Sequence, residues 1–150
     1  MYQRPAMDQL TDHIGRGFTA DVFRVGEYVV KKYRQRPNFA EHAVLEGERR
    51  LKAAGVPVVP IIDHWVHDGR WYCVQPLVQA PDMLSWSDDQ IRRGLELVEQ
   101  AYKAGVSDIK PDNVGLLDGE MAILDTGELD PQEWEPGETS QRWRILLRQR

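Results

Sequence analysis

The pattern of apolar and polar residues in the first half of the chain predicts a small antiparallel sheet. Residues 14–33 have the composition of two strands joined by a turn at Gly26-Glu27. A second hairpin is expected around Asp68-Gly69, because apolar and aromatic residues stand on both sides of this turn-forming pair. Together with one helix, these strands indicate an α+β arrangement over residues 1–79.

Two helices are predicted from capping residues and helical spacing. In the first, Asn38 and Glu41 have the spacing of an N-cap and its N3 partner, and Gly55 ends the run. The second is the clearest element of the chain, because it begins after the cap Ser87 and ends at Gly105. Its apolar face contains Ile91, Leu95, Val98 and Tyr102.

Two short strands are expected after the second helix. Residues 114–117 and 121–124 are apolar, and Asp118-Gly119-Glu120 between them favours a turn. The chain then becomes acidic and closes with a tail, residues 131–150, whose last apolar side chains are Trp143, Leu146 and Leu147. We expect these side chains and Trp134, or a partner chain, to cover the apolar face of the second helix.

Composition restricts the class of protein. With 150 residues, of which 41% are hydrophobic and 29% charged, the chain suits one folded domain. The net charge of −5 argues against a general nucleic-acid binder. The single cysteine, Cys73, excludes an internal disulfide framework, and no apolar run reaches the ~18 residues that a membrane helix requires. A cytoplasmic protein without membrane contact is therefore expected.

The segment VSDIKPDNV concentrates residues with catalytic chemistry in a loop. A carboxylate such as Asp108 can orient a hydroxyl and accept its proton, and Lys110 can neutralise charge on a transferred phosphoryl group. Asn113 and, after the second short strand, Asp125 offer the oxygen ligands that Mg²⁺ prefers. A lone Asp-x-x-x-x-Asn is more often a simple turn, so the prediction depends on several such elements standing in order.

The first hairpin adds a glycine pattern that suits phosphate binding. Gly15 and Gly17 precede Val22, and glycines in such a turn let backbone amides approach phosphate oxygens. Two nearby glycines more often make only a tight hairpin. A dinucleotide-binding fingerprint needs a helix after the glycines, whereas a strand is expected here.

A lysine follows on the next strand. Lys31 lies on the same face as Val29, whereas Lys32 faces the other way. A lysine in this position can reach the phosphates of a nucleotide, and a helix carboxylate can hold it. Glu48 is in phase with the apolar positions of the first helix, and Glu46 is the alternative partner.

In this order, the elements resemble those of a protein kinase much reduced in length. GRGFTADV resembles the glycine-rich loop, VVKK the strand with the nucleotide-binding lysine, and YCVQPLV the strand that leads to the hinge. DIKPDN resembles the catalytic loop of serine/threonine kinases, and DTG resembles the metal-binding D-F-G segment. The match covers residues 14–127.

The resemblance implies both a fold class and a division of the chain into two lobes and a tail. It implies a protein-kinase-like N-lobe, an antiparallel sheet plus one helix, followed by a truncated helical C-lobe. A single kinase-like domain would then span residues 1–150, with the N-lobe at 1–79 and a tail at 131–150. The reduced C-lobe, with the catalytic and metal loops, would occupy residues 80–130.

The resemblance also implies roles in catalysis, with ATP and Mg²⁺ as cofactors. Asp108 would be the catalytic aspartate, and Lys110 would support the γ-phosphate. Asn113 and Asp125 would bind Mg²⁺.

Nucleotide contacts are implied in the same way. Lys31, paired with Glu48, would hold the α- and β-phosphates. Gln75 would be the gatekeeper residue, at the position before the hinge. Adenine and the phosphates would meet the remaining contact residues, which are Gly15, Gly17, Val22, Leu77 and Val78.

Three departures from the kinase pattern bear on function. The usual His-Arg pair is absent before Asp108, which argues against control by a phosphorylated activation loop. No Ala-Pro-Glu segment follows Asp125. With only residues 126–150 left, most of the helical lobe that normally binds peptide substrates is missing.

The sequence therefore predicts a miniature ATP- and Mg²⁺-dependent kinase that phosphorylates serine or threonine hydroxyls of proteins. A pseudokinase that binds nucleotide and serves as a protein-binding or regulatory module is the alternative, which the missing lobe favours. A small-molecule kinase is a third hypothesis, and the presence of Lys110 agrees with it less well. A protein substrate or a regulatory protein is the expected partner, and a homo-oligomer is left open.

Overall fold

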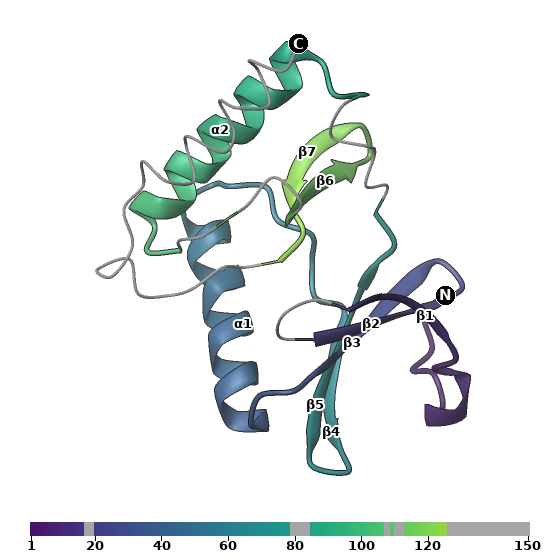
Figure 1. The fold of residues 1–150 in the computed structure, drawn as a ribbon. Coiled ribbons are helices and arrows are strands. Elements are labelled where there is room, and N and C mark those ends of the chain that lie inside the picture. Colours follow the sequence, from purple (N-terminus) through teal and green to yellow (C-terminus); the bar gives the residue numbers. More distant parts are fainter. Residues whose placement is uncertain (17–19, 79–84, 107–108, 110–112, 126–150) are drawn as a thin grey trace. The chain divides into compact units, whose positions relative to one another are not determined.

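The computed structural model has an α+β fold, and it divides into two units (Figure 1). The first unit contains residues 1–42 and 60–77, and the second contains residues 43–59 and 78–150, so that the boundary falls inside the first helix. The residues described are 1–16, 20–78, 85–106, 109 and 113–125.

A five-stranded antiparallel sheet forms the first unit, with the strand order β1-β2-β3-β5-β4. Both hairpins expected from the sequence are confirmed, since β2 pairs with β3 and β4 with β5. The strands are β1 (Asp12–Arg16), β2 (Ala20–Val25), β3 (Tyr28–Tyr33), β4 (Asp63–His67) and β5 (Arg70–Pro76).

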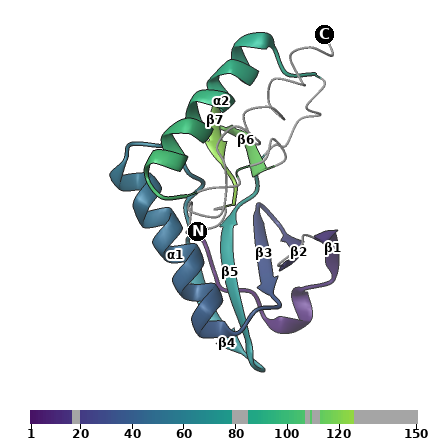
Figure 2. The ribbon, with the colours of Figure 1, turned by 60° about the vertical axis from the view of Figure 1, so that its left-hand side comes forward.

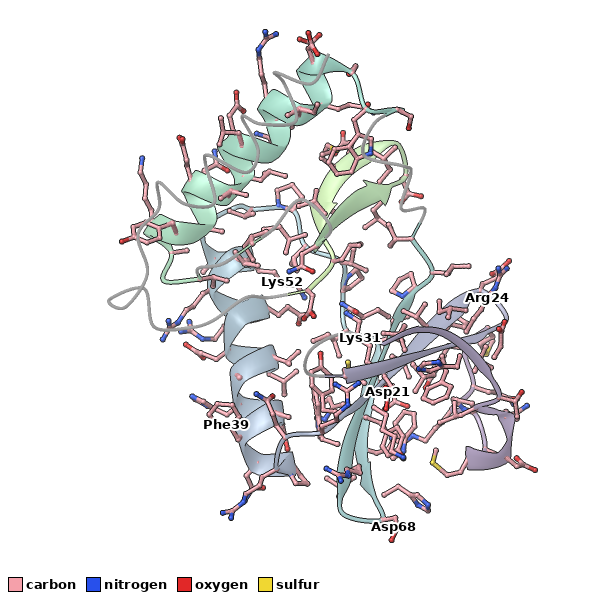
Figure 3. All side chains as sticks on the ribbon, viewed as in Figure 1. Asp21, Arg24, Lys31, Phe39, Lys52 and Asp68 are labelled. Atoms are coloured by element: carbon pink, nitrogen blue, oxygen red, sulfur yellow. The ribbon has the colours of Figure 1, made fainter. Side chains whose placement is uncertain are left out.

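Two-residue turns set the register of this sheet. Asp68 and Gly69 join β4 to β5, and both have positive φ, 49° and 72°, as the turn type that matches the twist of a hairpin requires. Asp68 marks the tip of this hairpin in Figure 3. Gly26-Glu27 joins β2 to β3 in the same short way, with Gly26 at φ 61°. Local turn chemistry therefore explains why the strand predictions succeeded.

The N-terminal segment covers one face of the sheet. Val30, Tyr72 and Val74 form a buried cluster on that face. The segment contains a short 3-10 helix, η1 (Met7–Gln9), and contributes the side chains that pack on the cluster: Tyr2, Met7 and Leu10.

Asp63 holds the N-terminal segment in place. Arg4 donates two hydrogen bonds to its carboxylate, at 2.9 Å from Nε and 2.8 Å from Nη2, and the Tyr2 hydroxyl donates a third at 2.7 Å. The Arg4 guanidinium also lies over the Trp65 ring, 4.7 Å from its centre. The hydrogen bonds from Arg4 and Tyr2 stabilise the ionised carboxylate and lower the pKa of Asp63 to about 2.

The first helix, α1 (Pro37–Ala53), begins one residue before the predicted cap Asn38. Proline is favoured at the first helical position, because its fixed φ suits the helix and its missing N–H has no partner there in any case. The expected end is confirmed. Gly55 has φ 75°, and the amide of Val56 donates back to the carbonyl of Leu51 at 2.9 Å.

The second helix, α2 (Asp88–Lys103), has the predicted N-terminal cap. The Ser87 hydroxyl accepts a hydrogen bond from the Gln90 amide at 3.1 Å, and the Gln90 side chain accepts one from the Ser87 amide at 2.9 Å. The predicted apolar face is confirmed at Ile91, Val98 and Leu95, of which Leu95 is half-buried against the core, and Tyr102 is half-buried. The fully buried positions are Ile91, Gly94, Leu97, Val98 and Ala101.

A hairpin completes the second unit and lies beside α2 in both views (Figure 1, Figure 2). It consists of β6 (Val114–Leu117) and β7 (Glu120–Ile123), joined by Asp118-Gly119 with φ 52° and 84°. The turn is thus one residue shorter than expected. The two strands pack with the end of α1 and with α2 around one core, whose largest fully buried side chains are Leu51, Trp86, Ile91, Leu97, Ile109 and Ile123.

The hairpin is also bound through its backbone to the segment after α1. The Val59 amide donates to the carbonyl of Ile123 at 2.9 Å, and the Ile123 amide donates to the carbonyl of Pro57 at 3.0 Å. Val58 and Ile123 form a parallel bridge between these bonds. Two segments of the second unit that lie at least 64 positions apart in the sequence are therefore held side by side. In the described part of the chain, no helix has the length and apolarity needed to cross a bilayer.

The Asp63 contacts predict an acid-dependent contribution to stability. Because the pKa of Asp63 is lower in the folded chain than its ordinary value of 3.8, its stabilising effect is full above pH 4 and is lost as the pH falls through about 2. We expect Asp63→Asn to lower the melting temperature by a few degrees at pH 7 and to differ less from wild type as the pH approaches 2. Thermal melts from pH 2 to pH 7 measure this difference.

The control for this experiment is Asp8→Asn, which neutralises an exposed carboxylate of the same N-terminal segment. It should change the melting temperature little at any pH. A difference in melting temperature between Asp63→Asn and wild type that does not depend on pH would show that the ionised Asp63 carboxylate is not the stabilising group.

Candidate functional site

Three of the predicted nucleotide contacts share one row of the sheet. Gly15 pairs with Val22 between β1 and β2, and Val22 pairs with Lys31 between β2 and β3. Directly opposed residues of antiparallel strands project on the same face. The row continues through Cys73 on β5 to His64 on β4. We call these five residues the cross-strand row.

Lys31 projects from β3, the middle strand of the sheet (Figure 3). The residue is only 9% exposed, whereas Lys32, on the opposite face, is half-buried. A buried ammonium is costly unless charged or polar groups surround it, so an ordinary solvated lysine does not account for this position. The choice of Lys31 over Lys32 made from the sequence agrees with this burial.

The backbone at the end of β5 limits how adenine could be bound. The Leu77 amide donates to the carbonyl of Glu27 at 2.8 Å. The Leu77 amide is therefore already engaged, and its carbonyl is the backbone group that it could offer a base. Gln75, the residue expected before the hinge, is buried opposite Val29 in the sheet.

The two carboxylates proposed as partners of Lys31 lie on the part of α1 that belongs to the second unit. Glu46 accepts hydrogen bonds from Arg49 and Arg50, which lower its pKa to about 2. Glu48 accepts from Lys52 at 3.3 Å, and its side chain is 15% exposed. Glu46 is therefore engaged by two guanidinium groups of its own helix, and Glu48 by Lys52.

The two predicted metal ligands meet at the open end of the β6–β7 hairpin. Val114 pairs with Ile123, and one step further the Leu124 amide donates to the carbonyl of Asn113 at 2.7 Å. Asp125 follows directly, so both residues extend from the same end of one hairpin. Both are half-buried. This arrangement follows from the strand pairing and not from their separation in sequence.

The described residues contain no group of three or more histidine, cysteine or acidic side chains close enough to hold a metal. An amide and a carboxylate suit Mg²⁺ in a different way, because this ion commonly takes one or two protein ligands and completes its shell with phosphate oxygens and water. Asn113 and Asp125 fit that requirement in number and in chemistry.

Several predicted residues fall outside the described residues. These are Gly17 of the glycine pattern, Asp108 and Lys110 of the catalytic segment, and the tail with Trp134 and the Trp143 group. The structure does, however, describe the residues that flank Asp108. Val106 is fully buried and Ile109 is 1% exposed, and both belong to the core of the second unit. The backbone is therefore anchored on either side of Asp108.

Sequence reasoning missed one polar contact next to this segment. Arg50 of α1 donates to the carbonyl of Gly105 at 3.1 Å. No local signal links residues 55 positions apart, although a glycine that ends a helix does indicate exposed carbonyls in need of donors.

The chain matches no protein-family model, and no curated protein matches it either.

The cross-strand row makes Cys73 a probe of the candidate site. Its side chain is 1% exposed and stands directly opposite Lys31. We expect a disulfide reagent to label Cys73 at least about 100-fold more slowly in the native protein than in urea, because labelling requires local opening. A ligand bound against the row should slow labelling further by mass action.

Since Cys73 is the single cysteine of the chain, the release of the reagent's thiol chromophore reports on this residue alone. Native labelling as fast as labelling in urea would show that the row is open to solvent.

Proposed function

We propose that the protein is a miniature phosphotransferase with a protein-kinase-like N-lobe, which uses ATP and Mg²⁺ to phosphorylate serine or threonine hydroxyls of proteins. The residues proposed to contact the phosphates belong to the first unit, and the residues proposed to bind the metal belong to the second. The single observation that carries the proposal is the shared row of Gly15, Val22 and Lys31.

The row has the parts that nucleotide binding needs. Among the described residues, a Cβ on Gly15 would touch only the Val22 side chain, at 3.8 Å, so there is space beside this part of the backbone. Val22 is half-buried and apolar, which suits contact with a base or ribose. Lys31 provides a positive charge on the same face. A glycine, an aliphatic side chain and a buried lysine in this order support binding of a phosphate-bearing heterocycle.

The metal site would be formed by Asn113 and Asp125, at the open end of the β6–β7 hairpin. Bound Mg²⁺ would neutralise the phosphate oxygens of ATP as charge shifts toward the leaving group. The residues of the chain would hold the ion through one amide oxygen and one carboxylate.

Asp108 and Lys110 would act on the transferred group. Asp108 would accept the proton of the attacking hydroxyl as the bond from its oxygen to the γ-phosphorus forms. The bond from the γ-phosphorus to the bridging oxygen breaks at the same centre, and ADP leaves with the electron pair. Lys110 would balance the negative charge of the transferred group.

The proposal predicts that phosphate transfer requires both acids. We expect Asp108→Ala to reduce transfer by about 10²–10⁴-fold, the range for loss of a general base, and Asp125→Ala to abolish the Mg²⁺-dependent rate. Transfer of radiolabelled γ-phosphate is measured to the protein itself, to a library of serine and threonine peptides, and to water. Asp89→Ala is the control, because that carboxylate lies exposed on α2.

Two outcomes would contradict this function. If wild type binds Mg²⁺-ATP but transfers phosphate to none of the acceptors, the protein is a nucleotide-binding module and not a kinase. If both variants transfer phosphate as fast as wild type, the roles assigned to Asp108 and Asp125 are wrong.

A second pair of variants tests the nucleotide contact. Lys31→Met keeps the length of the side chain and removes its charge, so we expect ATP affinity to fall at least about tenfold. Lys32→Met removes the neighbouring charge on the opposite face and should leave ATP affinity unchanged. Equal affinities for both variants, measured by calorimetry, would remove Lys31 from the site.

A further inference from the structure

Strand β4 forms one edge of the sheet in the first unit. It stands last in the strand order β1-β2-β3-β5-β4, and β5 is its one partner among the described strands. An edge strand carries a row of backbone amides and carbonyls that point away from the sheet and can pair with another chain. The edge of β4 is therefore a surface on which a further strand could be added.

The turn at Asp68-Gly69, whose tip is marked by Asp68 in Figure 3, determines which groups of β4 face outward. The residues that flank a two-residue turn exchange both of their backbone hydrogen bonds, and bonded pairs then alternate with unbonded pairs along the hairpin. Here His67 and Arg70 flank the turn. The amides and carbonyls of His64 and Val66 therefore point away from β5.

β4 lacks the features that usually protect an edge strand from pairing. Its sequence, DHWVH, contains neither lysine nor proline, and it pairs with β5 over all five residues without a shift of register. His64 is exposed, and Val66 is an apolar residue that is 56% exposed. The opposite edge differs, because the register of β1 shifts between His13 and Gly15. Such an irregularity bends an edge strand and interrupts its pairing.

β4 is complementary to a second copy of itself. In an antiparallel pair about a two-fold axis at Trp65, His64 of one copy would stand opposite Val66 of the other. Both residues direct their backbone groups outward, so they meet the requirement for hydrogen-bonded pairs on this edge. The two Trp65 side chains would face each other in the unbonded pair between them, where side chains approach most closely.

The same register sets no like charges directly opposite each other. Asp63 would face His67 of the second copy, so that a carboxylate stands opposite an imidazole. Within one copy the Asp63 carboxylate accepts hydrogen bonds from Arg4 and Tyr2 and lies close to the His64 amide. Because Arg4 already balances its charge, the pairing is driven by the backbone and by burial of Val66 and Trp65.

We propose that the protein forms a homodimer in which β4 pairs in antiparallel fashion with β4 of a second copy and joins the two five-stranded sheets. This inference does not depend on the proposed phosphotransferase function. Only one strand of each copy contributes to the interface, which is therefore small. We expect a dissociation constant on the order of 100 µM, as in weak and transient complexes.

Sedimentation equilibrium of the full chain from about 10 µM to about 1 mM measures the association. Val66→Lys places a charge on the pairing edge, and we expect it to weaken association at least about tenfold. Ile14→Lys is the matched control, because Ile14 is a 48% exposed aliphatic residue on the opposite edge strand, β1. Its dissociation constant should stay within about twofold of wild type. Both positions are exposed, so both variants should fold.

Disulfide cross-linking tests the register. Two variants, His64→Cys and Val66→Cys, are prepared in a Cys73→Ala background and oxidised separately and as a mixture. Positions 64 and 66 of different copies would be bonded partners with Cα atoms about 5.5 Å apart, within disulfide reach, whereas like positions would be about 7–8 Å apart. We expect the mixture to form cross-linked dimers at least about tenfold faster than either variant alone.

Three results would overturn the proposal. If wild type sediments as a monomer up to about 1 mM, β4 does not pair with itself, and its edge is left for an extended segment of a different protein. If Val66→Lys and Ile14→Lys weaken association equally, the copies meet through another surface. If either cysteine variant alone cross-links as fast as the mixture, the two strands are not paired about Trp65.

Discussion

Antiparallel pairing through two-residue turns is the constraint on which both units depend. Once Gly26-Glu27 and Asp68-Gly69 close their hairpins, the register of the sheet follows, and with it the set of side chains that share a face. A slip of one residue would move Lys31 to the other face and replace it with Lys32. In the second unit, Asp118-Gly119 has the same effect and brings Asn113 beside Leu124.

The two faces of the sheet are used differently. The face with Val30, Tyr72 and Val74 is covered by the N-terminal segment, which Arg4 and Tyr2 fasten to Asp63. The opposite face carries the cross-strand row. That face is buried as well, since Cys73 is 1% exposed, Gln75 6% and Lys31 9%.

In the second unit, a small number of long-range contacts fix the segments that lie next to the candidate functional residues. The bridge between Val58 and Ile123 fixes the hairpin, and Arg50 fixes the chain at Gly105. Both contacts start from α1 or from the segment that follows it. α1 and the segment that follows it therefore contact both the chain at the end of α2 and the β6–β7 hairpin.

The sequence was informative wherever a local rule applies. The Asp-Gly turns and the Ser87 cap with Gln90 were predicted and are confirmed, because each depends on residues within a few positions of one another. The apolar face of α2 was predicted only in part. Gly94 and Ala101 are fully buried, but small side chains give almost no hydrophobic signal. The start of α1 was misplaced by two residues, since Asn38 suits the cap position and Pro37 suits the first helical position.

The sequence by itself determined strands β2 to β7, the turns of their three hairpins, both helices and the type of chemistry available at each position, whereas β1 was not predicted. Only the tertiary structure decided that Cys73 and His64 extend the row of Gly15, Val22 and Lys31 across the sheet, and that Arg50 reaches Gly105. Turns and caps are set by the conformational preferences of neighbouring residues. The choice of a partner dozens of residues away is made by packing, which no short stretch of sequence encodes.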